Sequence, residues 1–131
     1  MTEHKDFAEL ENTLRERREA LRGNIERHLM EAEEDQYRDI AHRVRDAGEA
    51  SVYDLIKGLE FERIETESRE LEAVEHALIK FDNSQYGLCE DCGRRIQLER
   101  LRAEPTAMRC ITCQEKREIE FGGGERGTAT L

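Results

Sequence analysis

Large aromatic side chains and proline are almost absent from this sequence. Tryptophan does not occur, aromatic residues make up 5% of the 131 residues, and there is a single proline. So little aromatic bulk cannot fill a wide globular core, whereas the scarcity of proline allows long, uninterrupted helices. The composition therefore predicts a mainly α protein.

Long apolar runs are also missing. No stretch approaches the ~18 consecutive apolar residues of a membrane-spanning helix. The first six residues are charged or polar apart from Met1, and no apolar segment follows them. We therefore expect no signal peptide and no membrane contact, and a cytoplasmic location. Neither a Ser–His–Asp arrangement nor a glycine-rich phosphate loop is present, so the sequence gives no support for an enzyme.

Basic residues are too few to balance the acidic ones. The chain has 31 acidic and 21 basic residues, a net charge of −10, and residues 1–88 carry that whole excess with 23 acidic and 13 basic residues. Proteins that bind duplex DNA through its phosphates usually present a basic face. We therefore expect no direct sequence-specific DNA binding, and a partner with a basic surface.

Apolar residues recur at spacings of three, four and seven in two long stretches, which is typical of amphipathic helices. Gly48 interrupts the pattern between them. The spacing predicts a long antiparallel coiled-coil hairpin over residues 1–82, with helices at about 5–44 and 52–82 and a tip at 45–51. The first helix is longer, so its N-terminal turns extend towards the C-terminal part, where they either pack or splay away. We expect a monomer.

All four cysteines lie in two CxxC pairs, and 17 residues separate the pairs. Two short turns that each supply two thiolates suit the tetrahedral geometry of zinc. We therefore predict one structural Zn²⁺ bound by Cys89, Cys92, Cys110 and Cys113. A pair of redox dithiols fits this separation poorly, and an iron site of similar geometry is the other alternative. The predicted module covers residues 83–121 and ends in a short helix, and a flexible tail follows at 122–131.

The flanks of the cysteines match a known pattern together with their spacing. The matching residues are Phe81, Tyr86-Gly87-Leu88-Cys89-Glu90-Asp91-Cys92-Gly93, Ile96, Arg100-Leu101, Ala103, Pro105-Thr106-Ala107 and Cys110-Ile111-Thr112-Cys113. This segment resembles the DksA/TraR family, in which a C-terminal four-cysteine zinc module is joined to a long coiled-coil hairpin. The resemblance implies a bacterial transcription regulator that binds RNA polymerase directly, with its hairpin in the secondary channel.

The resemblance also assigns the tip. The family motif there reads Asp-x-x-Asp-x-Ala, and the equivalent residues are Asp46, Glu49 and Ser51. The first acid matches, the second is Glu for Asp, and a serine replaces the alanine. The resemblance implies that this tip approaches the polymerase active centre. From the residues alone, capping of the turn and of the next helix is the better explanation of Asp46 and Glu49.

Three departures concern a regulatory ligand. Family members that respond to guanosine tetraphosphate carry basic residues at the positions of Ala73, Glu104 and Gln114. Two of these positions are neutral here and one is acidic. Binding of guanosine tetraphosphate at this site is therefore not expected.

Two other functions remain open on the sequence. The first is a zinc-dependent module that docks the hairpin on a different protein. The second is a nucleic-acid-binding zinc ribbon, which is disfavoured because nearby acids offset its basic residues. Those basic residues are Arg94, Arg95, Arg100, Arg102 and Arg109.

Overall fold

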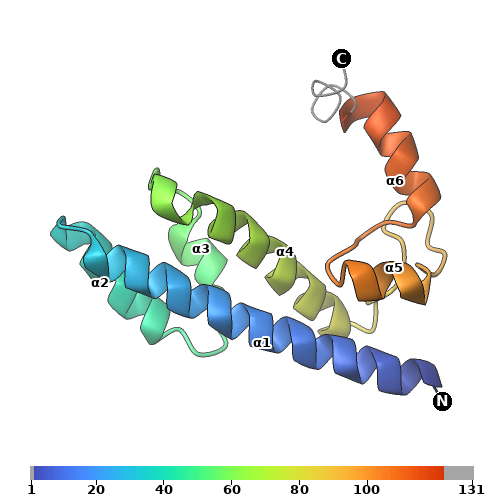
Figure 1. The fold of residues 1–131 in the computed structure, drawn as a ribbon, viewed down its shortest axis with the longest axis horizontal. Coiled ribbons are helices and arrows are strands. Elements are labelled where there is room, and N and C mark those ends of the chain that lie inside the picture. The colour runs from blue at the N-terminus through green and yellow to red at the C-terminus, as the bar shows by residue number, and fades with distance from the viewer. Residues whose placement is uncertain (1, 123–131) are drawn as a thin grey trace.

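Helices account for nearly all regular structure in the computed structural model, which describes residues 2–122 (Figure 1). Within these residues the β pairing is limited to one antiparallel bridge between Leu88 and Arg95, so the mainly α fold class is confirmed. No helix in this part of the chain is both long and apolar enough to cross a membrane. The tail predicted at 122–131 lies outside the described residues from 123 onwards. The elements are α1 (Thr2–Glu31), α2 (Asp35–Arg45), α3 (Val52–Ile56), the 3-10 turn η1 (Glu62–Ile64), α4 (Glu65–Asp82), α5 (Leu98–Ala103), α6 (Ile111–Arg117) and the π-helical turn η2 (Glu118–Gly122).

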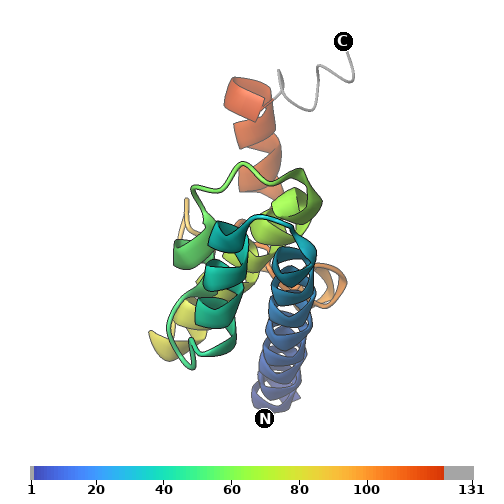
Figure 2. The same ribbon diagram turned by 90° about the vertical axis from the view of Figure 1, so that its left-hand side faces the viewer.

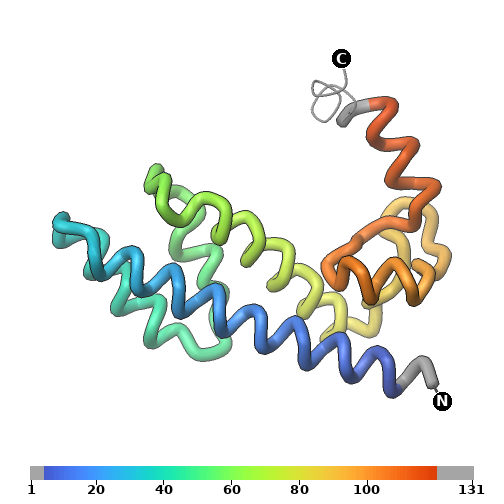
Figure 3. Tube along the Cα trace, in the orientation of Figure 1, coloured from blue at the N-terminus to red at the C-terminus, as the bar shows by residue number. Residues whose placement is uncertain are grey.

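Helix α1 forms the longest element, with 30 residues and a length of roughly 45 Å at 1.5 Å per residue. Helix α4 runs antiparallel beside it (Figures 1 and 3). The two helices bury a common apolar stripe, because residues at spacings of three and four lie on one helix face. The antiparallel pair predicted from the sequence is therefore present. Its buried members are Leu10, Leu14, Leu21, Ile25 and Leu29 on α1 and Leu71, Val74, Ala77 and Leu78 on α4.

Neither predicted helix is continuous, and in this detail the prediction was wrong. The first breaks at residues 32–34 and the second at residues 57–61. After each break the chain folds back, so that α2 and α3 pack against α1 and α4 as a four-helix arrangement (Figures 1 and 2). The physical reason is burial. An isolated helix pair covers one side of each stripe only, whereas the folded arrangement adds Ala41, Val44, Val52 and Ile56 to the same core.

The predicted tip at 45–51 joins α2 to α3, but it does not lie at the far end of the molecule. It lies beside the middle of α1, where Arg22 donates hydrogen bonds to its backbone. The far end is instead formed by the two breaks, where the Tyr37 and Phe61 rings stack with centroids 4.7 Å apart.

The first turns of α1 pack on the C-terminal module and do not splay away. The Phe7 ring contacts Tyr86 edge-on at a centroid distance of 5.3 Å, and Tyr86 stacks on Phe81 at 3.9 Å. Arg102 donates a hydrogen bond to the buried Asp6 carboxylate at 3.0 Å. Gly87 has φ +86°, and a Cβ there would lie 2.7 Å from Cζ of Phe7. Only glycine fits this contact, which joins the module to α1, and the stacking of Tyr86 on Phe81 joins it to α4.

We expect Leu71→Ala to lower the free energy of unfolding by about 2–5 kcal/mol, because it leaves a cavity at a residue with no exposed surface. Ile79→Ala on the same helix is the matched control. Its side chain is 55% exposed, so the change should stay within about 0.5 kcal/mol. Urea titration followed by circular dichroism measures both values. Equal effects from the two substitutions would contradict the assignment of the buried face.

Candidate functional site

The two CxxC pairs meet at one point although they are far apart in the sequence. One ligand atom from each of Cys89, Cys92, Cys110 and Cys113 lies within 4.8 Å of the others. The first pair lies in a tight turn that Gly93 closes with φ +78°, since its N–H donates to the Cys89 carbonyl at 2.9 Å. In the second pair, Cys110 is the N-cap of α6, and its Sγ accepts a hydrogen bond from the Cys113 N–H.

The electrostatics of this cluster favour a bound cation. Burial opposes charge on the Cys89 thiol, but backbone hydrogen bonds at Cys110, Cys92 and Asp91 outweigh it and lower its pKa to about 6. The hydrogen bond with Cys110, together with burial and the neighbouring thiols, raises the pKa of Cys113 to about 12. Without a cation the four sulfurs therefore do not all carry charge, and an ion between them would favour the thiolate form of each.

The donor set fits Zn²⁺. Sulfur ligands from two tight turns match a closed tetrahedral site, and four of them leave no position for water or substrate. The residues thus hold a structural metal ion. Apart from the ligand Cys89, the buried residues of this region are few, namely Tyr86, Ile96 and Leu101. The ion would supply folding free energy that so small a core cannot provide.

Tyr86 anchors the module through both its ring and its hydroxyl group. The hydroxyl donates a hydrogen bond of 2.8 Å to the Pro105 carbonyl, and burial raises the pKa of the phenol to about 12. The phenol therefore stays neutral and keeps this bond under physiological conditions.

A polar contact also connects the first cysteine turn to α4. Glu90 Oε2 lies 2.6 Å from His76 Nε2, within hydrogen-bonding distance, and accepts a hydrogen bond from Lys80 Nζ at 3.3 Å. Burial works to raise the pKa of Glu90, but these contacts outweigh it and leave the pKa below its usual value. This role of His76 was not predicted, because His76 lies 13 positions before Cys89 and shares no ligand spacing with it.

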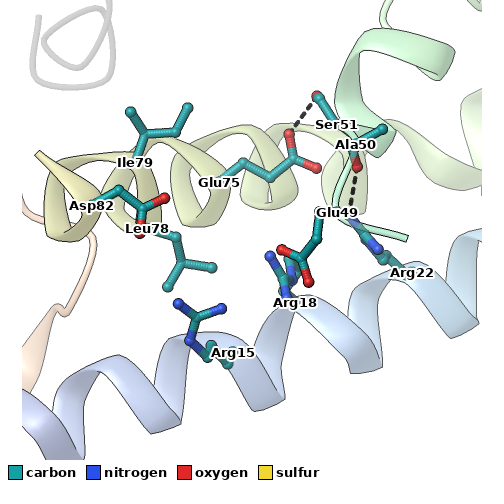
Figure 4. Close-up of a pocket in the computed structure, with 10 residues that line it drawn as sticks. All are labelled: Arg15, Arg18, Arg22, Glu49, Ala50, Ser51, Glu75, Leu78, Ile79 and Asp82. Carbon is teal, nitrogen blue, oxygen red and sulfur yellow. Dashed lines mark hydrogen bonds between the residues drawn. The ribbon is translucent and has the colours of Figure 1, made fainter. Parts of the chain in front are cut away.

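The loop at 46–51 is fixed by two charged side chains (Figure 4). Arg22 on α1 donates to the carbonyl oxygens of Gly48 at 2.7 Å and Ala50 at 2.8 Å. Glu75 on α4 accepts from Ser51 Oγ at 2.6 Å and from the Val52 N–H at 2.9 Å. Neither role was predicted. The one available signal is that Arg22 directly follows Leu21 of the apolar stripe and Glu75 directly follows Val74.

The three tip residues differ in their surroundings. Ser51 is the N-cap of α3 and accepts the Asp54 N–H at 3.0 Å, so the capping expected of Asp46 and Glu49 belongs to Ser51. The Asp46 side chain is 77% exposed. Glu49 lines a cavity of about 260 Å³ beside Arg15 and Arg18 (Figure 4).

The three positions of the family's regulatory ligand line one groove. Ala73, Glu104 and Gln114 border a space of about 610 Å³ between α4, α5 and α6. Glu115 adds a further acid to its lining, and Arg100 lies 3.9 Å from Glu104. Arg109 also borders the groove but pairs with Asp91 at 3.1 Å, so both arginines have acidic partners and little positive charge is left for a phosphate-rich ligand.

Several arginines of the suggested nucleic-acid surface have acidic partners. Arg102 pairs with Asp6 at 3.0 Å, Arg109 with Asp91 at 3.1 Å, and Arg100 with Glu104 at 3.9 Å. These contacts reduce the positive charge available to phosphates, which disfavours a nucleic-acid-binding ribbon.

Comparisons with known proteins agree with this geometry. Residues 84–118 match the family described as prokaryotic dksA/traR C4-type zinc finger. Residues 84–118 are thus similar to the zinc finger of the DksA/TraR family. The chain is 38% identical over 61 residues to the RNA polymerase-binding transcription factor DksA of Haemophilus influenzae and of Escherichia coli, a match that covers 47% of this chain and 42% and 40% of theirs. The match thus spans about two fifths of the length of these relatives.

A solved structure is similar over most of the chain. Transcription factor DksA2 from Pseudomonas aeruginosa matches with a TM-score of 0.57 and 24% sequence identity, over 88% of this chain and 85% of that one. This likeness concerns the fold, and it extends beyond the zinc finger to the helical part.

Replacing Cys110 with serine should abolish stoichiometric zinc binding, because a neutral hydroxyl is a poor ligand compared with a thiolate. Amide exchange should accelerate across residues 86–117 while α1 and α4 stay protected. Thr112→Ser in the same turn is the control and should keep one zinc per chain. Metal analysis by mass spectrometry checks the content. Full zinc content in Cys110→Ser, or none in the parent protein purified without chelator, would contradict the site.

Proposed function

We propose that this protein regulates transcription by binding RNA polymerase directly. The observation that carries this proposal is the four-cysteine zinc finger, which matches proteins named as RNA polymerase-binding transcription factors. The acidic helical part supports it, because its excess of negative charge favours a basic protein surface over nucleic acid.

We further propose that the helical part acts in the secondary channel of the polymerase and that Asp46 and Glu49 modulate promoter complexes there. Asp46 ends α2 through its backbone N–H and Ser51 caps α3, so the exposed Asp46 carboxylate supports a role in contacting a partner. Basic side chains or the bound Mg²⁺ of the polymerase active centre are suitable targets for such carboxylates.

A zinc-dependent module with a different protein partner is the second candidate. The exposed side chains of Ile111 and Ile119, at 51% and 82%, favour it because they give α6 and η2 an apolar surface. Affinity purification of the tagged chain from its native host distinguishes the candidates. Recovery of polymerase subunits supports the first, and their absence beside another stoichiometric protein supports the second.

Asp46→Asn should remove the effect on transcription while polymerase binding and zinc content stay unchanged, because the two side chains have nearly the same shape and differ in charge. Asp54→Asn is the matched control, since Asp54 is an exposed acid on α3 outside the tip motif. In vitro transcription with purified polymerase provides the measurement. An intact effect in both Asp46→Asn and the double variant with Glu49→Gln would refute a role of the tip acids.

Transcriptional effects should depend little on guanosine tetraphosphate at the groove formed by Ala73, Glu104 and Gln114. Each missing charge-assisted contact removes roughly 1.5–3 kcal/mol of binding free energy. Calorimetric titration of the zinc-loaded protein should therefore show no binding at micromolar ligand. Binding that Glu104→Ala abolishes would overturn this prediction.

A further inference from the structure

The break between α1 and α2 has no local cause in the sequence. The segment from Glu31 to Asp35 contains neither glycine nor proline, and most of its residues cost little in a helix. The apolar positions also continue through it with helical spacing, from Leu29 to Ala32, Ile40 and Val44. Local preference thus favours one straight helix, and tertiary contacts must maintain the bend.

The second break faces the first. Residues 57–61 interrupt the other arm, where Phe61 stacks on Tyr37 and Arg63 lies 3.9 Å from Glu31. Both arms therefore bend at the same level of the molecule (Figures 1 and 2). This arrangement is that of a paired hinge, about which α2, the 46–51 loop and α3 can turn as one body.

The contacts that hold this body against α1 and α4 include a small number of polar ones. Arg22 binds two loop carbonyls and Glu75 binds the start of α3, while Arg45 lies 3.9 Å from Glu26. Arg22 is only 9% exposed and its Nε has no hydrogen-bond partner. We call the Arg22 and Glu75 contacts with the loop and the start of α3 the clasp. An unpaired buried donor costs free energy, so the Arg22 part of the clasp is weaker than its two hydrogen bonds suggest. Ala41, Val44, Val52 and Ile56 add apolar contact.

We propose that the helical part is a folded hairpin that opens by straightening both arms at this hinge. In the open form α1 and α2 join into one helix of about 44 residues, roughly 66 Å long, and the 46–51 loop moves to its far end. A partner that binds the loop favours opening by its difference in affinity for the two forms. The proposal concerns the free protein and does not rest on the polymerase.

Pulsed electron–electron double resonance, which measures distances between spin labels, tests the opening on the full-length, zinc-loaded protein. Spin labels on non-natural amino acids at positions 23 and 46 avoid the metal-binding cysteines. A side chain at Gly23 meets open space, and the Asp46 side chain is exposed. In the folded form the labels lie close together, because Arg45 contacts Glu26. In the open form the 23 intervening steps of one helix separate them by about 35 Å. Labels at the exposed positions 16 and 72 report on the α1–α4 pair, which does not change.

Two substitutions shift the equilibrium in opposite directions. Arg22→Leu removes the clasp but keeps apolar bulk, and it should raise the long-distance population about tenfold. Arg27→Leu, at an exposed arginine on the same helix, should leave it unchanged. Asp35→Pro should abolish the long-distance population. Residue 35 is the first of α2 and follows the extended Glu34 (φ −74°, ψ 131°), so proline fits the folded form but breaks a straight helix.

The result that supports the proposal is a minor component near 35 Å in the parent protein, which grows in Arg22→Leu and disappears when Asp35→Pro is added. Lack of the long component in Arg22→Leu, with the 16–72 distance intact, would overturn it. Persistence of the 35 Å component in the double variant would also overturn the proposal. If Arg22→Leu disturbs the 16–72 distance, Glu75→Gln is used in place of Arg22→Leu, and the same outcomes support or overturn the proposal.

Discussion

The apolar stripe of α1 is the constraint on which the rest of the structure depends. Its first turns contact the zinc module through Phe7, its middle packs on α4, and Ile25 and Leu29 share a core with α2 and α3. A single amphipathic helix cannot bury such a stripe alone, so each other element gains its position by covering part of it. Arg22, directly beside Leu21, also fixes the loop that carries the tip acids.

The metal centre has a structural role at the C-terminal end of the molecule. Four sulfur ligands close the site to substrate, so the ion stabilises a module whose own core is small. The module is attached to α4 through Glu90 with His76 and Lys80, and to α1 through Asp6 with Arg102. These contacts fix how the helical part projects from the zinc module, and that geometry matters for a protein proposed to reach into a large enzyme.

Sequence reasoning worked where the signal is local and failed where tertiary contacts decide. The spacing of Cys89, Cys92, Cys110 and Cys113 predicted the metal centre because two tight turns impose it. The apolar spacing predicted the α1–α4 pair. The break at 32–34 could not be predicted, since no glycine or proline lies between Glu31 and Asp35 and most residues there cost little in a helix. The clasp made by Arg22 and Glu75 was equally hidden, because charged residues beside an apolar stripe are usually solvated.

The central functional claim is that this protein reaches RNA polymerase with the loop at 46–51. Site-specific photo-cross-linking tests it most directly, with a photoreactive amino acid at position 49 in a complex reconstituted from purified, zinc-loaded protein and polymerase. Direct binding through the loop predicts cross-links to polymerase residues that line the secondary channel, and their loss when the zinc is removed. Absence of any polymerase cross-link from this position, or cross-links confined to promoter DNA, would contradict the proposed function.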